Sequence, residues 1–431
     1  MDSSVVFPFE KVLEGPVRNG IYKPKEYHGR GAKIVNMGEL FAYPRLGAID
    51  MKRVELNSSE AERFSLKSGD LLFARRSLVA DGAGKCCIVM NVDGLTTFES
   101  SIIRARPDPQ KANSLYLFYF FSSPQGFNLL DTIRRQVAVA GITGGDLSKL
   151  QIPVPKLTEQ QHIAGILGAL DDKIDLNRRM NETLETLARL IFKDWFVDFG
   201  PVRAKMEGRE PFGLEPDVTD LFPDNIGVNG LPDGWRYGCL SEIAVSPRRP
   251  ADPGRLDPDT PYIGLEHIPR RSIALTEWKE VGKVTSGKSE FRKGEFLYGK
   301  LRPYFHKSVI APINGVCSTD IVVVREKTAE WSSFLLCTIS STEFVNYTDR
   351  TSSGTKMPRT NWTDMGSYSL PLPPVKVASA FNALVHPMTD RIISNIQENR
   401  TLASLRELLV PKLISGEIRV SEAEKMLDAA L

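Results

Sequence analysis

The sequence predicts an α+β protein in which two mixed α/β domains are separated by two long helices. The stretch from Thr158 to Phe199 has apolar residues at heptad spacing, and a second stretch near the C-terminus repeats it. Ahead of each helix, short strand-like runs alternate with Gly- and Pro-rich turns. We expect the helices to pair with each other as an intramolecular, antiparallel coiled coil, so that the chain is an internal pseudo-two-fold repeat.

The first long helix is predicted over residues 156–200. Asn177 and Asn181 interrupt its apolar seam. Polar seam residues lower stability but fix the register, because a misaligned helix would bury them unpaired. With these two asparagines included, the seam positions follow one another at steps of four and three, and the apolar ones are Ile163, Leu167, Leu170, Ile174, Leu184, Ala188, Ile191 and Trp195.

The second long helix is predicted over residues 375–420, because an offset of 218 residues maps the first helix onto it. Asn177 and Asn181 map onto Asn395 and Asn399, and we interpret all four as register residues. The same offset holds without a gap for the whole stretch, because it maps residues 153–195 onto residues 371–413. This favours one duplicated helix over two unrelated amphipathic helices.

These helices divide the chain into segments. We expect a first domain over 1–155, a spacer helix over 156–200, a linker over 201–230, a second domain over 231–374, a second spacer helix over 375–420 and a tail over 421–431. Thr158 and Gln161 form a capping-box pattern at the start of the first helix. Pro387 and Pro411 are expected to kink or segment the second. In the first domain, the aromatic run 115–121 is expected to begin a buried helix that continues to Leu130.

Composition sets broad limits on the protein. A length of 431 residues suggests about three units at roughly 150 residues each. The net charge of +2 neither demands nor excludes a nucleic-acid partner. Five cysteines, including the vicinal pair Cys86 and Cys87, fit a reducing cytoplasm. No signal peptide opens the chain, and no apolar run approaches the roughly 18 residues that span a bilayer, so we expect an intracellular protein without membrane contact.

Signatures of catalysis are missing from the sequence. Residues 81–85 (DGAGK) resemble a phosphate loop, but Val79 stands at its first glycine position and Cys86 at its Ser/Thr position. The histidines and cysteines show no metal-ligand spacing. We therefore expect no catalytic residue, no metal and no cofactor in this chain.

Basic residues on predicted loops are the candidates for function. Arginine can bind a guanine edge with two hydrogen bonds, lysine neutralises phosphate, and a Gly/Ser/Thr-rich loop lets backbone amides approach phosphate. Both domains place such residues at matching points, after the strand-like runs that begin at Gly69 and Gly294. The candidate DNA-binding residues are Arg75, Arg76, Arg104, Arg134, Arg135, Thr143, Lys300, Arg302, Lys307, Arg350 and Lys356.

Two other interpretations stay open. Surface lysines and arginines usually serve only solvation, and the chain would then be a coiled-coil scaffold that joins two protein-binding domains and does not bind DNA. The third interpretation is an enzyme with a dispersed site between Gly69 and Val89, in which Lys85 takes part.

The sequence resembles the specificity subunits of type I restriction-modification systems over essentially its full length. The resemblance rests on the two-domain, two-helix repeat and on five stretches that are specific in combination: 152–161 (IPVPKLTEQQ), 176–181 (LNRRMN), 193–199 (KDWFVDF), 231–235 (LPDGW) and 409–418 (LVPKLISGEI). The chain departs from the family pattern at its N-terminus, where residues 5–10 (VVFPFE) stand in place of the Pro-x-Gly-Trp opening.

The resemblance implies that the two mixed domains are target-recognition domains, each reading one half of a split site in double-stranded DNA. The coiled coil would act as a ruler between the half-sites, as dimer geometry does elsewhere. It also implies docking of two methyltransferase subunits, which use S-adenosylmethionine, and of restriction (motor and nuclease) subunits. The chain itself would be a non-catalytic recognition subunit.

Overall fold

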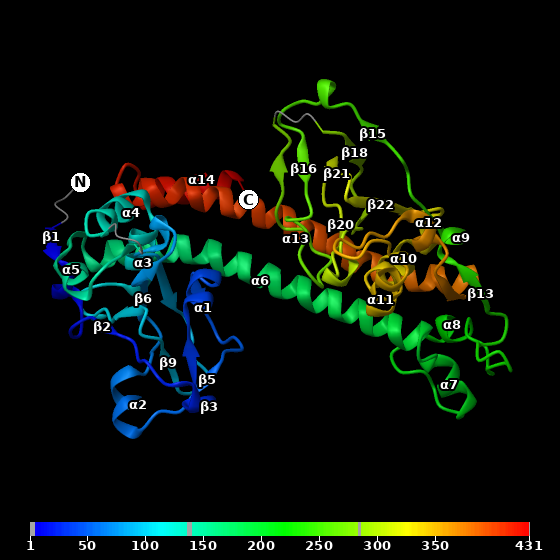
Figure 1. Ribbon diagram of the computed structural model, residues 1–431, viewed down its shortest axis with the longest axis horizontal. Coiled ribbons are helices and arrows are strands. Elements are labelled where there is room, and N and C mark those ends of the chain that lie inside the picture. The colour runs from blue at the N-terminus through cyan, green and yellow to red at the C-terminus, as the bar shows by residue number, and fades with distance from the viewer. Residues whose placement is uncertain (1–4, 136–139, 283–285, 431) are drawn as a thin grey trace. The chain divides into compact units, whose positions relative to one another are not determined.

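The computed structural model describes residues 5–135, 140–282 and 286–430 (Figure 1). The chain divides into two compact units, of which the first joins residues up to Asp172 with those from Leu402 onward, and the second is residues 173–401. Each unit holds one mixed domain and a part of both long helices, α6 (Leu157–Phe196) and α13 (Val375–Ser415).

The mixed domain of the first unit is built on a five-stranded sheet of order β2-β10-β6-β8-β4, with a three-stranded sheet β5-β3-β9 and the pairs β1-β12 and β7-β11. Its strands are β1 (Val5–Pro8), β2 (Arg18–Asn19), β3 (His28–Val35), β4 (Arg45–Leu46), β5 (Arg53–Val54), β6 (Leu71–Ala74), β7 (Arg76–Ser77), β8 (Cys86–Val89), β9 (Thr96–Phe98), β10 (Ile102–Ala105), β11 (Ala140–Gly141) and β12 (Gln151–Val154). Its helices are η1 (Phe9–Val12), η2 (Lys25–Tyr27), α1 (Met37–Ala42), α2 (Ser58–Phe64), η3 (Ala80–Gly82), α3 (Ser114–Ser122), α4 (Pro124–Asp131) and α5 (Gly144–Lys149), and α14 (Val420–Ala430) belongs to the same unit.

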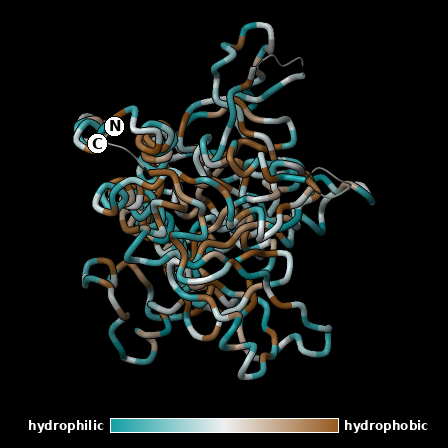
Figure 2. The backbone as a smooth tube through the Cα atoms, turned by 90° about the vertical axis from the view of Figure 1, so that its left-hand side faces the viewer, coloured by the Kyte–Doolittle hydropathy of each residue, from teal (hydrophilic) through white to brown (hydrophobic). Residues whose placement is uncertain are grey.

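The core of this domain follows from its apolar strands. Every residue of β6, β8 and β10 is buried, as expected for central strands that are covered on both faces. Apolar stretches of the chain lie mostly inside and hydrophilic stretches mostly in projecting loops (Figure 2). The single helix expected from residue 115 to Leu130 is instead two helices, α3 and α4. Ser123 caps the second by accepting a hydrogen bond from the backbone of Gly126, and Pro124 occupies its first turn, so the chain turns there.

The second unit contains a four-stranded sheet β14-β22-β19-β20, a five-stranded sheet β15-β18-β21-β16-β17 and the pair β13-β23. Its strands are β13 (Arg236–Cys239), β14 (Ala244–Val245), β15 (Pro250–Ala251), β16 (Pro261–Ile263), β17 (Lys279–Glu280), β18 (Lys288–Phe291), β19 (Phe296–Gly299), β20 (Ser308–Ile310), β21 (Gly315–Ser318), β22 (Ile321–Glu326) and β23 (Ser369–Leu372). Its helices are α7 (Gly200–Met206), α8 (Pro216–Thr219), α9 (Leu240–Ile243), η4 (Pro253–Arg255), η5 (Pro303–Phe305), η6 (Ala329–Trp331), α10 (Ser332–Ile339), α11 (Thr342–Arg350) and α12 (Trp362–Gly366).

The two domains share one plan. The 218-residue offset maps α3, α4 and α5 onto α10, α11 and α12. It also maps β12 onto β23, with the same first and last positions. At an offset of 225 residues, β6 corresponds to β19, the centre of the other main sheet. The β1-β12 pair corresponds to β13-β23, so residues 5–8 take the place of the strand that follows the LPDGW stretch. The duplication therefore includes the domains, and β15 and β18 are additions to the second.

The long helices run antiparallel, as predicted. In the second unit Asn177 meets Asn399, and Asn181, one turn further along α6, meets Asn395, one turn earlier in α13. The seam positions Ile163, Leu167, Leu170, Ile174, Ala188 and Trp195 are buried, while Leu184 and Ile191 are partly buried.

The expected segmentation of the second helix is wrong, because α13 runs as one helix through Pro387 and Pro411. Each proline removes one backbone hydrogen bond to the carbonyl four residues earlier, at Ala383 and Glu407. Both of those residues are exposed, so the missing hydrogen bonds lie on the solvent-facing side of the helix.

The start of α6 also differs from its prediction. The helix begins at Leu157, which places Thr158 inside it and leaves no capping box there. The neighbouring, fully buried Gln160 secures the start instead. Its amide donates to the carbonyl of Pro155 at 2.9 Å and accepts from the backbone N–H of Asn113 at 2.8 Å, so it ties the helix to α3 of the same unit.

The segment between the first helix and the second domain is an ordered connection that includes α7 and α8. Val202 and Phe222 in this segment are buried in the core of the second unit. Across the described ranges, no helix combines the length and the apolar character needed to cross a bilayer.

Candidate nucleic-acid interface

The first domain presents cationic residues where β7 meets β11. Arg76 in β7 pairs with Gly141 in β11, and Arg135 and Gly141 exchange backbone hydrogen bonds of 2.9 and 3.2 Å. These pairings hold residues 135 and 141 against each other beside the loop that follows β6. We call the described residues of this region, 75–79 with 135 and 140–143, the first tip.

Arg76 and Arg135 are exposed at the first tip. The Arg135 guanidinium donates to a carboxylate oxygen of Asp146 at 2.8 Å, and the Thr143 hydroxyl donates to the same oxygen, also at 2.8 Å. These hydrogen bonds hold the pKa of Asp146 below its usual value, with the bond from Thr143 as the largest cause. Thr143 also caps α5, so its side chain has a structural partner. Of these side chains, Arg76 and Arg135 present charge to solvent.

The second domain builds the same arrangement from different residues. Ser353 and Arg359 exchange backbone hydrogen bonds of 3.0 and 2.9 Å, and Arg359 also pairs with Leu301, just after β19. The N–H of Arg302 donates to the carbonyl of Pro358 at 2.7 Å, which joins this hairpin to the loop. We call residues 300–304 with 353–359 the second tip.

The two tips occupy equivalent places in their domains. The 218-residue offset maps the paired residues 135 and 141 onto the paired residues 353 and 359, and the 225-residue offset maps Arg76 onto Leu301. The helix that follows each pair begins at an equivalent cap, Thr143 or Asn361. Each domain thus carries two backbone-paired residues at the same spacing, and one of them also pairs with the loop after the central strand.

Predicted DNA-binding residues of the second domain lie partly at its tip. Lys356 is exposed in the hairpin, and Arg350 is exposed at the end of α11, shortly before it. Lys300 and Arg302 are half-buried at the base of the loop, as Arg75 is in the first domain.

Three predicted residues have side chains that are engaged within the fold. Arg104 is 8% exposed and donates to the carbonyl of Ser65 at 2.8 Å. The side chain of Arg134 is 3% exposed and pairs with Asp131 at 2.6 Å. Lys307 donates to a backbone carbonyl, and burial lowers its pKa. The structure gives each of them a role in holding the domain, so we leave them out of the interface proposed below.

The sequence prediction did not include two cationic residues near the second tip. Arg359 is the hairpin partner of Ser353, and aligning it with Gly141 at the 218-residue offset could have found it. Arg248 lines a groove of about 510 Å³ together with Lys300, Asn361 and Trp362, among others. No local sequence signal marks Arg248, because strand pairing brings it to this groove.

The four predicted register residues meet in two pairs. An Asn177 amide N–H donates to the Asn399 side-chain oxygen at 3.0 Å, and the Asn395 amide donates to that of Asn181 at 2.8 Å. Asn177 also donates to Glu398 at 2.8 Å. Each asparagine meets the copy of the other, which is the pattern that a two-fold duplication of antiparallel helices requires.

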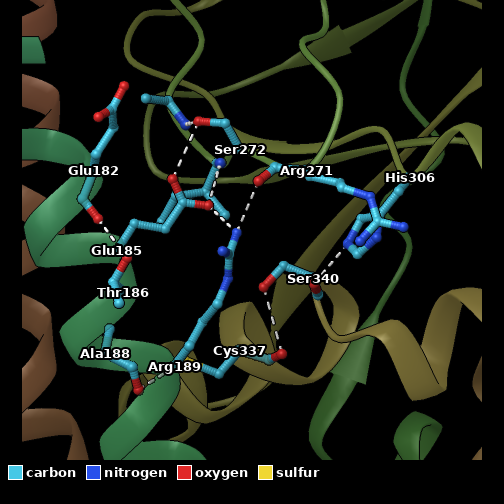
Figure 3. A network of polar contacts seen from close by, with 12 residues as sticks. Glu182, Glu185, Thr186, Ala188, Arg189, Arg271, Ser272, His306, Cys337 and Ser340 are labelled. Atoms are coloured by element: carbon cyan, nitrogen blue, oxygen red, sulfur yellow. Dashed lines mark hydrogen bonds and ion pairs between the residues drawn. The ribbon is translucent and has the colours of Figure 1, made fainter. Parts of the chain in front are cut away.

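A polar network fastens the second domain to α6 (Figure 3). Glu185 is buried and accepts hydrogen bonds from the backbone N–H of Ile273 at 2.9 Å and the Ser272 hydroxyl at 3.1 Å. Arg189 pairs with Glu185 and also donates to the carbonyl of Arg271 at 3.0 Å. Desolvation raises the pKa of Glu185, outweighing its pairing with Arg189 and its other hydrogen bonds.

The region considered for an enzymatic site is occupied by structural contacts. The Lys85 ammonium donates to the carbonyl of Phe41 at 3.3 Å. Burial raises the pKa of the Cys87 thiol to about 12 and that of Cys86 well above its usual value, which disfavours the reactive thiolate. Within the part of the chain that the structure describes, no three His, Cys, Asp or Glu side chains are grouped to hold a metal ion.

Comparisons with known proteins agree with this architecture. Residues 21–186 match the family described as type I restriction modification DNA specificity domain. The chain is 27% identical over 324 residues to the MjaIX type I restriction enzyme specificity subunit of Methanocaldococcus jannaschii, covering 72% of this chain and 70% of that protein. It is 25% identical over 412 residues to the HindI specificity subunit of Haemophilus influenzae, covering 82% and 87%. Its fold is similar to that of the type I system S subunit from M. genitalium, with a TM-score of 0.57 and 14% identity over 95% of both chains.

Proposed function

We propose that the chain, which is similar to the specificity subunits of type I restriction-modification systems, recognises DNA sequence and reads a bipartite site with its two mixed domains. Each domain reads one half-site through its tip. The chain contributes recognition and leaves catalysis to its partner subunits in the cytoplasm.

The duplication of the tips is the observation that carries this proposal. The two domains have little sequence similarity at their tips, yet both tips have the same backbone pairing to the loop after the central strand. Each tip also presents exposed cations. Arginine and lysine on such loops suit both phosphate contacts and the guanine edge. The first tip presents Arg76 and Arg135, whereas the second presents Lys356 and Arg359. Because these residues differ, the two half-sites are expected to differ in sequence.

The coiled coil supports the role of a ruler. The asparagine pairs make a slip by one helical turn costly, since it would leave buried amides without partners. We therefore infer that α6 and α13 set a fixed spacer between the half-sites.

The outer faces of the long helices support docking of two methyltransferase subunits, with restriction subunits joining the complex. Leu187 and Leu190 are 42% and 59% exposed on α6. The 218-residue offset maps them onto Leu405 and Leu408 on α13, of which Leu408 is 43% exposed. Two equivalent apolar surfaces suit two copies of one partner. S-adenosylmethionine is expected to bind to that partner.

Methylation by the assembled complex tests the proposed function. The chain is purified with its methyltransferase subunit, supplied with S-adenosylmethionine and a library of random duplex DNA, and the methylated adenines are mapped. Enrichment of one split sequence is expected. Binding to that sequence should fall steeply with salt, because phosphate contacts release counterions. Methylation without sequence preference would refute recognition, and absence of salt-dependent DNA binding would favour the protein scaffold.

A further inference from the structure

Each tip projects apolar side chains from among its cations. Leu78 is 91% exposed and Val79 is 68% exposed, two and three residues after Arg76. In the second tip Tyr304 is 50% exposed, two residues after Arg302. The 225-residue offset that maps β6 onto β19 also maps Leu78 and Val79 onto residues 303 and 304, so the exposed side chains occupy equivalent loops.

Both loops are held in place by hydrogen bonds between their own residues. In the first, the N–H of Val79 donates to the Ser77 hydroxyl at 3.1 Å, and the N–H of Gly82 donates to the carbonyl of Val79 at 3.0 Å. In the second, the N–H of Phe305 donates to the carbonyl of Arg302 at 3.0 Å. The fold thus presents these side chains to solvent in an ordered turn.

A single exposed apolar residue is ordinary on a protein surface. Here, however, the apolar residues recur at one place in two domains whose sequences differ there, and each tip also holds exposed cations. The cations suit the phosphate backbone, whereas an apolar side chain gains nothing from phosphate. On DNA it is stabilised by contact with bases, either against a thymine methyl group or between base steps.

We propose that Leu78 with Val79 in the first tip, and Tyr304 in the second, contact bases of duplex DNA, each within the half-site of its own domain. They thereby contribute to sequence preference, while the neighbouring cations position the backbone. This inference rests on the proposed function and adds the base-contacting residues to it.

The test uses the full chain with its methyltransferase subunit and S-adenosylmethionine, on DNA in which one half-site at a time is randomised. Leu78→Ser and Tyr304→Ala are each expected to lower methylation of the preferred sequence about tenfold, a typical loss for one base contact. Each should also broaden the preference at positions of one half-site only, and the two variants should affect different half-sites. The salt dependence of DNA binding should not change, because no charge is removed.

Matched variants separate this effect from general damage. Leu95→Ser and Tyr237→Ala change exposed apolar residues outside the tips of the same domains, 46% and 58% exposed, and are expected to stay within about twofold of the unaltered complex. Leu78→Met keeps an apolar tip and should retain the preference. Unchanged preference in both tip variants, or equal broadening in both half-sites, would overturn the inference while the proposed function stands. Methylation without sequence preference by the unaltered complex would overturn both.

Discussion

At the scale of single residues, the seam asparagines offer the sharpest test of how the helices are aligned. Asn395→Leu alone removes the partner of the buried Asn181 amide and is expected to destabilise the second unit by about 1–3 kcal/mol. Replacing both members of the pair by leucine should recover most of this loss, because an apolar seam pair packs well. Urea unfolding of the single and double variants in a mutant cycle measures the coupling.

The control for this cycle has the same composition but a different pairing. Asn177→Leu with Asn395→Leu removes one member of each pair, so Asn399 and Asn181 both lose their asparagine partner. It should therefore be less stable than the variant that replaces Asn181 and Asn395 together. Equal stability of the two double variants would show that the pairing has no energetic role.

Glu185 predicts a pH dependence of the contact between the second domain and α6. Its pKa is raised above the reference value of 4.5 by burial, so the folded state binds its proton more readily than the unfolded state. Its contribution to stability is fully present below that value and is lost as the pH rises through the raised pKa. Glu185→Gln removes this loss, so the melting temperature of the variant relative to the unaltered chain should rise as the pH is raised above 4.5.

The comparison variant is Glu182→Gln, on the exposed face of the same helix. Its melting temperature relative to the unaltered chain should not change with pH in that manner. Thermal unfolding at a series of pH values measures both variants. A Glu185→Gln difference that stays constant across the range would contradict the assigned cause.

The sequence alone could not show which of the basic side chains are exposed. Arg76 and Arg104 both lie in or beside a strand, yet the first is exposed and the second buried with its guanidinium on a backbone carbonyl. The difference depends on which neighbouring segment covers the strand, and that is settled by contacts between residues distant in the chain. Charge and spacing alone could not separate the two.

At the scale of elements, the prolines of α13 yield a prediction about the helix. Pro387 is exposed, and its ring leaves the carbonyl of Ala383 without its helical partner. Pro387→Ala restores that hydrogen bond, while a more flexible unfolded chain offsets part of the gain. We expect a net stabilisation of about 1–2 kcal/mol. Hydrogen exchange of amides within one turn of residue 387 should slow, and faster exchange there would show that the proline is needed.

The elements also show which features a sequence can reveal. The long helices and their antiparallel pairing were predictable because a heptad pattern repeats over some ten turns and is duplicated. The equivalence of the paired residues 135 and 141 with 353 and 359 was not predictable. The two segments share almost no residue types and are similar only in their backbone pairing. The break between α3 and α4 was likewise missed, although Ser123 and Pro124 form a start signal for a helix.

At the scale of the whole molecule, the proposed ruler predicts how the recognised site responds to the length of the helices. Because α6 and α13 are antiparallel, a heptad must be added to both. Insertion between Asp172 and Lys173 and between Thr401 and Leu402 leaves the contacts within each unit intact. One heptad adds about 10 Å of helix, which corresponds to about three base pairs of duplex.

The lengthened chain, assembled with its methyltransferase subunit, is expected to methylate a site whose spacer is longer by about three base pairs and whose half-sites are unchanged, because the tips are untouched. Mapping of methylated adenines in a random library measures spacer and half-sites together. An insertion of two residues in each helix serves as the control, since it rotates the apolar seam by about 200°, away from its partner, and should abolish specific methylation. If the heptad variant keeps the original spacer, the helices do not set the distance. If its half-sites change, the tips do not read them independently of the coiled coil.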